Sequence, residues 1–260
     1  MNKTYLVPAL EKAHHILMLI ADSKEKRLKL TDLVLKLNYN KSTVFSLLSS
    51  MEQFKWIVKN EDLTYSIGST LGRWGVEFFR NFNIREIFDQ EAKPLANEIN
   101  QTIQLSILDG QDIIYLSKQN GNQSFKITTY PGLRVKAYAP AMGKVLLSRF
   151  SYQELSELYE EKFEPLTIAT VRNVHDLWQQ IEDYHTKGYI IEREETILGF
   201  VCLAVPIFND RRKIIAAMST TLTTTEADKT LDLELICEKM KAVSKKISAS
   251  CFTNFDFRED

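Results

Sequence analysis

Two amphipathic segments separated by the polar break Asn38-Tyr39-Asn40 constrain the fold of this chain more than any other stretch. In the first segment, Thr31 is placed as an N-cap, and Leu30 and Leu35 are spaced for a hydrophobic staple. In the second, apolar residues recur at the i, i+3, i+4, i+7 spacing of a helix with one buried face: Val44, Leu47, Leu48 and Met51. The pattern predicts a short helix, a turn and a longer helix.

The outer face of the second predicted helix is small and polar, with a basic residue at its start. Its residues are Lys41, Ser42, Thr43, Phe45, Ser46 and Ser49. A short helix, a tight turn and such a second helix are typical of a helix-turn-helix, in which the second helix enters the major groove of DNA. An αα-hairpin buried in any helical domain has the same pattern, so this stretch alone leaves both interpretations open.

The neighbouring segments favour DNA binding. A first helix is predicted over residues 8–21, with one apolar face formed by Leu10, Ala13, Leu17 and Ile20. Residues 56–59 and 64–68 predict two strands joined by a polar turn. Three helices and a hairpin are the order of a winged helix-turn-helix domain, with Lys59 and the turn as a wing against the phosphate backbone. A hairpin that contacts no DNA is the alternative.

Residues 70–81 predict a further helix with apolar residues on more than one side. We interpret it as a linker helix that packs against a partner chain, because most helix-turn-helix proteins bind two half-sites as dimers. A helix packed only inside its own chain is the alternative. The predicted organisation is a DNA-binding domain over residues 1–68, a linker over 69–82 and a second domain over 83–260.

The charge of the chain is uneven although its net value is only −1. Residues 1–80 carry 12 Lys and Arg against 8 Asp and Glu, and the remainder is mildly acidic. A basic N-terminal third suits a domain that contacts phosphates. The sequence shows no secretion signal and no apolar run of about 20 residues, so we expect a cytoplasmic protein. The three cysteines have no metal-type spacing, and we expect no disulfide.

The second part of the chain mixes helices and strands without regular βαβ alternation. Strands are predicted over residues 102–108, 113–117, 124–129, 189–193, 200–208 and 213–221. Helices are predicted over residues 84–100, 141–149, 152–160, 174–187 and 225–249. This order indicates an α+β fold in which an antiparallel sheet is flanked by helices.

Six motifs in register make the sequence resemble the isocitrate lyase regulator (IclR) family of bacterial transcription regulators. They are VPALEKAHHIL, NKSTVFSLLSSME, YSIGSTLGRWG, ILDGQDIIYL, APAMGKVLL and GYIIEREETILGFVCLAVPIFND. The resemblance covers residues 6–225. It implies a winged-helix domain joined by a helix to a GAF-like effector-binding domain, in a homodimer or a dimer of dimers. It also implies operator DNA as a partner and a small metabolite that alters operator affinity; we expect a repressor.

The recognition helix departs from the family pattern, which usually has a basic or imidazole pair where this chain has Phe45-Ser46. Arginine is the commonest reader of guanine and is missing there. We interpret Phe45 as a contact for thymine methyl groups, while Lys41, Ser42, Thr43 and Ser49 bind phosphates or base edges. Packing of Phe45 against the first helix or the wing is the alternative.

The resemblance also implies an effector site for a carboxylate-bearing organic or sugar acid. The matching positions are Ala141, Met142, Glu192, Cys202, Ser219 and Thr221, with apolar walls at Ile127 and Val135. Ala141 and Met142 start a predicted helix, whose free N–H groups attract a carboxylate. Glu192 stands where oxo-acid binders have the shorter Asp, so the identity of the effector does not carry over. Cys202 by itself is also compatible with a small buried hydrophobe.

No pattern for catalysis, metal binding or a bound cofactor stands out. Neither His175 nor His185 lies in a motif that would activate Cys202, and no zinc spacing or phosphate-binding glycine loop is present. We therefore expect a regulator and not an enzyme. The alternative function is an α+β small-molecule-binding or catalytic domain whose helical N-terminus only contacts proteins; binding of DNA that weakens with salt separates the two.

Overall fold

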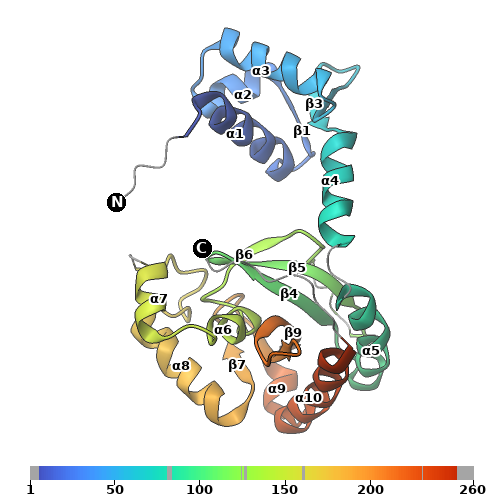
Figure 1. Ribbon diagram of the computed structural model, residues 1–260, viewed down its shortest axis with the longest axis vertical. Coiled ribbons are helices and arrows are strands. Elements are labelled where there is room, and N and C mark those ends of the chain that lie inside the picture. Colours follow the sequence, from blue (N-terminus) through green and yellow to red (C-terminus); the bar gives the residue numbers. More distant parts are fainter. Residues whose placement is uncertain are drawn as a thin grey trace. The chain divides into compact units, whose positions relative to one another are not determined.

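The computed structural model describes residues 6–80, 84–123, 125, 128–159, 162–229 and 231–250. The chain divides into two compact units, Met1–Asn81 and Phe82–Asp260. Both are drawn in Figure 1, and each is described by itself below. In the described part of the chain, no helix is long and apolar enough to cross a membrane.

The first unit combines four helices with a small antiparallel sheet of strand order β1-β3-β2. Its helices are α1 (Pro8–Asp22), α2 (Leu30–Leu37), α3 (Lys41–Gln53) and α4 (Ser69–Arg80), and its strands are β1 (Arg27–Lys29), β2 (Ile57–Lys59) and β3 (Thr64–Ile67). The core contains Ala13, Ile16, Ile20, Leu33, Val44, Leu48, Met51, Ile57 and Tyr65. The predicted helix-turn-helix and hairpin are confirmed, and β1 adds a third strand that the sequence reading did not include.

Three local predictions in this unit are wrong. Helix α2 begins at Leu30, after Lys29, whose backbone N–H donates to Asp32 Oδ2 at 3.1 Å, so Thr31 lies inside the helix. The proposed staple does not form, because Leu35 is 83% exposed. In α1, Ile16 is fully buried and Leu10 is exposed, which shifts the apolar face from the predicted one.

The second unit is built on a six-stranded antiparallel sheet of order β6-β5-β4-β9-β8-β7. Its strands are β4 (Ile103–Asp109), β5 (Asp112–Gln119), β6 (Arg134–Lys136), β7 (Ile190–Arg193), β8 (Phe200–Phe208) and β9 (Ile214–Thr223). Its helices are α5 (Ile84–Ile99), α6 (Ala141–Leu147), α7 (Tyr152–Leu158), α8 (Val174–Lys187), α9 (Thr224–Lys229) and α10 (Leu233–Ser250). The predicted α+β class and the antiparallel sheet are confirmed.

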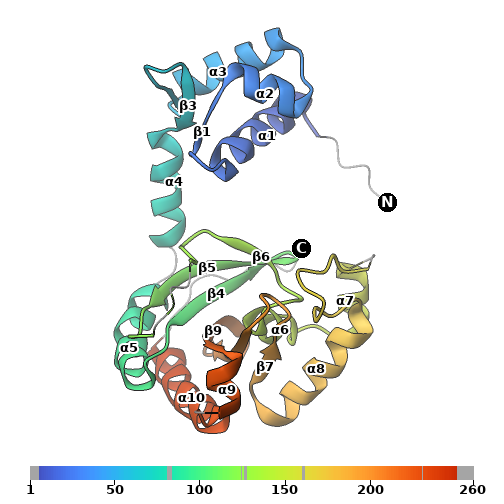
Figure 2. The same cartoon turned by 180° about the vertical axis from the view of Figure 1, so that it is seen from behind.

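Helices cover this sheet on two sides. Figures 1 and 2 show α5 and α10 together at one side, and α6, α7 and α8 at the other. Alternation along β8 explains both layers, since successive side chains of a strand point to opposite faces. Cys202 and Ala204 belong to the core around α6 and α8, while α10 also packs against β8.

Two predicted elements of this unit differ from the structure. The single terminal helix is two helices, α9 and α10, because Asp232 Oδ1 accepts the N–H of Leu235 at 3.0 Å and caps a new helix start. In the predicted strand 124–129, the described residues Phe125, Thr128 and Thr129 are not in a strand, and the other residues lie outside the described part. The strand that pairs with β5 on the side away from β4 is β6.

Candidate functional site

The outer face of α3 is exposed, as the sequence predicts. Val44 and Leu48 are fully buried on one side of the helix, whereas Lys41, Ser42 and Ser46 are exposed on the other. Phe45 is 55% exposed, so it does not pack into the core of this unit. The Ser49 hydroxyl donates to the Phe45 carbonyl oxygen at 3.0 Å, which leaves its oxygen lone pairs for other partners.

The hairpin after α3 has a well-held tip. Asp62 Oδ1 accepts hydrogen bonds from the Thr64 hydroxyl at 2.5 Å and from the Thr64 N–H at 3.1 Å. These hydrogen bonds lower the pKa of Asp62. The Asn60 side-chain amide donates to the Thr64 hydroxyl at 3.0 Å. Lys59 is exposed at the end of β2, directly before this turn. A rigid turn beside an exposed lysine is suited to contact a phosphate backbone.

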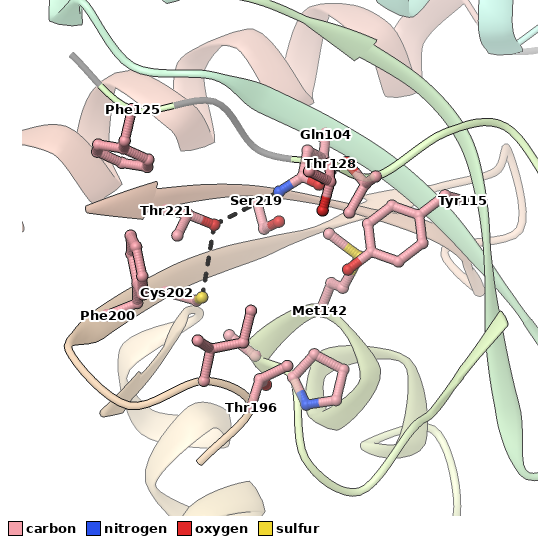
Figure 3. Close-up of a pocket in the computed structure, with 14 residues that line it drawn as sticks. Gln104, Tyr115, Phe125, Thr128, Met142, Thr196, Phe200, Cys202, Ser219 and Thr221 are labelled. Carbon is pink, nitrogen blue, oxygen red and sulfur yellow. Dashed lines mark hydrogen bonds between the residues drawn. The ribbon is translucent and has the colours of Figure 1, made fainter. Parts of the chain in front are cut away.

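A cavity of about 200 Å³ lies in the second unit, between α6, the β4–β5 and β8–β9 strand pairs and the loop after β7 (Figure 3). None of the described residues that line it is charged. The lining residues are Gln104, Tyr115, Phe125, Thr128, Thr129, Pro140, Ala141, Met142, Thr196, Ile197, Phe200, Cys202, Ser219 and Thr221.

Five of the predicted effector residues line this cavity together: Ala141, Met142, Cys202, Ser219 and Thr221. Val135 packs against the hydrophobic core near α6 and does not line the cavity. Glu192 does not line it either, and Ile127 lies outside the described residues. Ala141 and Met142 contribute the first peptide groups of α6, whose N–H groups have no acceptor within the helix.

Glu192 is 2% exposed and lies opposite Cys202 in the β7–β8 ladder. Its Oε2 accepts a hydrogen bond from the Glu195 N–H at 2.9 Å. The side chain, which is longer than the Asp of oxo-acid binders, therefore binds a group of the protein itself. Burial raises the pKa of Glu192, while hydrogen bonds from Cys202 and the Glu195 N–H, together with the charge of Lys144, oppose the shift. The structure therefore places Glu192 next to the lining residue Cys202 but outside the cavity lining.

Hydrogen bonds link the polar side chains of the lining. The Thr129 hydroxyl donates to Gln104 Oε1 at 2.7 Å, and Gln104 Nε2 lies 3.4 Å from the Thr221 hydroxyl. Thr221 Oγ1 lies 3.5 Å from Cys202 Sγ, as the dashed lines of Figure 3 show. Burial raises the pKa of the Cys202 thiol well above its usual value, so Cys202 is a neutral thiol here.

Nine lining residues were not predicted from the sequence, and most of them have no local signal. Gln104 and Ser106 are the two polar residues between apolar residues in β4, and of these Gln104 lines the cavity. Phe125 and Phe200 come from segments distant in the sequence. Their ring centroids lie 5.2 Å apart in a T-shaped arrangement. The other missed residues are Tyr115, Thr128, Thr129, Pro140, Thr196 and Ile197.

A buried ion pair lies next to the cavity. Lys144 of α6 is fully buried, and its ammonium group donates to the Glu195 carboxylate and to Gln180 Oε1 of α8, the latter at 2.6 Å. Gln180 Nε2 also donates to Glu195 at 3.0 Å. Burial lowers the pKa of Lys144, and Glu195 opposes that shift. The pair joins α6, α8 and the loop after β7.

Comparison with known proteins decides the family. Residues 76–249 match the family described as Bacterial transcriptional regulator IclR C-terminal, and residues 9–61 match the IclR helix-turn-helix domain. The chain belongs to the IclR family. It is therefore a DNA-binding transcription regulator with an effector-binding C-terminal domain, and the catalytic alternative is set aside.

Similar proteins support this assignment along nearly the whole chain. The HTH-type transcriptional regulator XynR of Escherichia coli K12 is 30% identical, over 86% of this chain and 89% of XynR. The transcriptional repressor IclR of the same organism is 26% identical, over 81% and 78%. An IclR homolog from Microbacterium hydrocarbonoxydans, crystallised with 4-hydroxybenzoate, has a TM-score of 0.78 at 15% identity, covers 93% of this chain and 98% of its own, and shows the shared fold.

Proposed function

We propose that this chain is a repressor that binds operator DNA through α3 and the β2–β3 wing and is controlled by a small organic acid in the cavity. Residues 1–68 form the DNA-binding domain, 69–82 the linker and 83–260 the effector domain. The observation that carries DNA binding is the exposed outer face of α3, with Lys41 at its start and Phe45 uncovered. A similar repressor is known in Escherichia coli K12.

The chemistry of the cavity supports an organic acid as effector. Hydroxyl groups of Ser219, Thr221 and Tyr115 and the peptide N–H groups that begin α6 can donate to a carboxylate. Burial raises the pKa of Tyr115, so its phenol stays protonated as a donor. The rings of Phe125 and Phe200 offer an apolar surface to the rest of the ligand. The cytoplasm is where such metabolites and operator DNA occur together.

Operator binding is tested with the full chain and a pool of random duplexes from which bound DNA is selected and sequenced. We expect one enriched half-site, and affinity that falls steeply between about 50 and 200 mM salt because phosphate contacts release counterions. Lys41→Ala should lower affinity for operator and random DNA alike and reduce the salt slope by about one. No enrichment and no salt dependence would contradict the proposal.

Effector binding is tested by thermal shift with small carboxylic acids, each matched with its amide. A ligand at about 100 times its Kd should add about 2.7 kcal/mol of folded-state stability, and the amide should add less. By linkage, an acid that weakens operator binding must itself bind more weakly to the operator complex. Equal stabilisation by acids and amides would reject a carboxylate-bearing effector.

A further inference from the structure

The loop between β7 and β8, residues 194–199, holds a buried hydroxyl group that forms no hydrogen bond with the described residues. Thr196 lines the cavity, and its Oγ1 is buried without a hydrogen-bond partner in the described part of the chain. Buried hydroxyl groups in folded proteins are nearly always paired, because an unpaired one loses its water without compensation. Its neighbour Ile197 also lines the cavity, so this loop forms part of the ligand-facing wall.

The two residues before Thr196, Glu194 and Glu195, are held by hydrogen bonds to neighbouring segments. The Thr170 hydroxyl donates to the Glu195 carbonyl oxygen at 2.6 Å, and the Val171 N–H donates to Glu195 Oε2 at 3.1 Å. Glu194 of the same loop is held in two ways. Its carbonyl oxygen accepts from the Thr167 hydroxyl at 2.6 Å, and its Oε1 accepts from the Gly199 N–H at 2.7 Å. The loop is therefore held in one conformation, and the position of Thr196 is set before any ligand binds.

An ion pair of Glu195 also connects this loop to α6, which forms another part of the cavity wall. Glu195 pairs with Lys144, which lies on α6, and α6 begins with the cavity residues Ala141 and Met142. Thr196 thus keeps a fixed distance from the segment that we propose binds the carboxylate. A ligand that reaches both positions needs a second polar group at a defined separation from its carboxylate.

We propose that Thr196 is the residue by which this site selects its effector, and that its hydroxyl binds a hydroxyl or carbonyl oxygen on the uncharged part of a small organic acid. This inference rests on the proposed function, because it takes the carboxylate from there. A hydroxyl can both donate and accept, so it pairs with either kind of oxygen. Among the described residues that line the cavity, none carries a charged side chain that would compete for that group.

The test compares pairs of acids that differ by one oxygen: 4-hydroxybenzoate with benzoate, glycolate with acetate, and pyruvate with propionate. Calorimetric titration of the full chain measures each Kd. The variants are Thr196→Val, which removes the hydroxyl at nearly constant shape, and Thr196→Ser, which keeps it. Thr186→Val, an exposed position on α8, is the matched control.

We expect the wild type to bind the oxygenated member of one pair about three- to tenfold more tightly, as one hydrogen bond supplies. Thr196→Val should lose this preference, and Thr196→Ser and Thr186→Val should keep it. Ligand-free Thr196→Val should melt at or above the wild-type temperature, because no internal bond is lost.

Three outcomes would overturn the proposal, and they are distinguishable. A preference that survives in Thr196→Val removes Thr196 from recognition but leaves the organic-acid effector intact. A ligand-free Thr196→Val protein that melts well below the wild type shows that the hydroxyl has a structural partner. Absence of binding by any of the six acids to the wild type rejects this ligand class and, with it, the organic-acid proposal.

Discussion

At the scale of single residues, Phe45 is the exposed aromatic side chain of the surface that we propose binds DNA. It is 55% exposed on a helix whose other face is fully buried, and it lies among serine residues. A benzene ring offers no hydrogen bond to a base edge, but it can contact the methyl group of thymine. An exposed phenylalanine is also costly in water, so burial on DNA would recover hydrophobic energy.

Phe45→Ala is expected to lower the affinity for the selected operator by about 1–3 kcal/mol, the value of one good base contact, and to leave random DNA nearly unaffected. Competition gel-shift titration at fixed salt measures both. Ser50→Ala on the same helix, where the hydroxyl donates to the Ser46 carbonyl oxygen, is the matched control. If Phe45→Ala weakens both DNAs equally, Phe45 does not read bases.

Glu192 makes stability depend on pH. Because burial raises its pKa in the folded chain, its contribution to stability is complete below its usual value of 4.5 and is lost as the pH rises through the raised value. The groups that face it are Lys144, Glu195 and Cys202. Glu192→Gln keeps an acceptor for the Glu195 N–H but removes the buried charge.

We expect Glu192→Gln to melt above the wild type at pH 8, with the difference shrinking toward pH 5, as followed by circular dichroism. The exposed Glu86→Gln of α5 corrects for general charge effects. A difference that grows as the pH falls would mean that Glu192 is held ionised by its partners.

At the scale of elements, the second unit depends on a charged pair in its interior. Lys144 and Glu195 are 0% and 5% exposed in their side chains, and they connect α6, α8 and the 194–199 loop. A close backbone approach accompanies this contact, since a Cβ on Gly143 would lie 2.1 Å from the Ala137 carbonyl oxygen. Two features therefore hold the start of α6 in place. Gly143 allows close contact with the Ala137 backbone, and the buried Lys144 pairs with Glu195.

Lys144→Met is expected to cost about 3–5 kcal/mol, because it leaves the Glu195 carboxylate buried without a cation. The double variant Lys144→Met/Glu195→Gln should cost clearly less than the two single effects together. Urea unfolding of the second unit, followed by its own Trp178, measures each midpoint. Strict additivity would show that the two side chains do not interact in the folded chain.

At the scale of the whole molecule, α4 joins the two units along the chain and carries exposed apolar residues. Trp74 is 47% and Val76 is 56% exposed, and a Cβ built on Gly72 or Gly75 would have no atom of another described segment within 4 Å. An exposed apolar face on a linker helix, beside small residues, is suited to pack against a second copy of this chain. We therefore keep the proposal of a homodimer, or a dimer of dimers, on two half-sites.

Val76→Glu is expected to shift the chain toward the monomer in sedimentation experiments and to weaken binding to a two-half-site operator. Leu35→Glu, which places the same charge at an 83% exposed position on α2, is the control for oligomeric state. A wild-type protein that sediments as a monomer at micromolar concentration would reject the proposed dimer.

The sequence by itself determined the features that repeat locally. The 3.6-residue spacing of Val44, Leu48 and Met51 predicts the buried face of α3, since that period depends only on the helix itself. The hairpin, the α+β class and helix α8, which ends at Lys187 before Gly188 with φ +72°, follow from the same kind of signal. Motifs in register added the family and five residues of the cavity.

Only the tertiary structure decided which side chains meet. The cavity is lined from segments more than 100 residues apart, and no local period relates Gln104 to Thr221 or Phe125 to Phe200. Glu192 is buried where the Glu195 N–H donates a hydrogen bond to its carboxylate. Lys144 is buried where its ammonium group donates to Glu195 and Gln180. Local patterns report whether a position faces a core, but the partner of a buried polar group depends on which distant strands and loops the fold brings beside it.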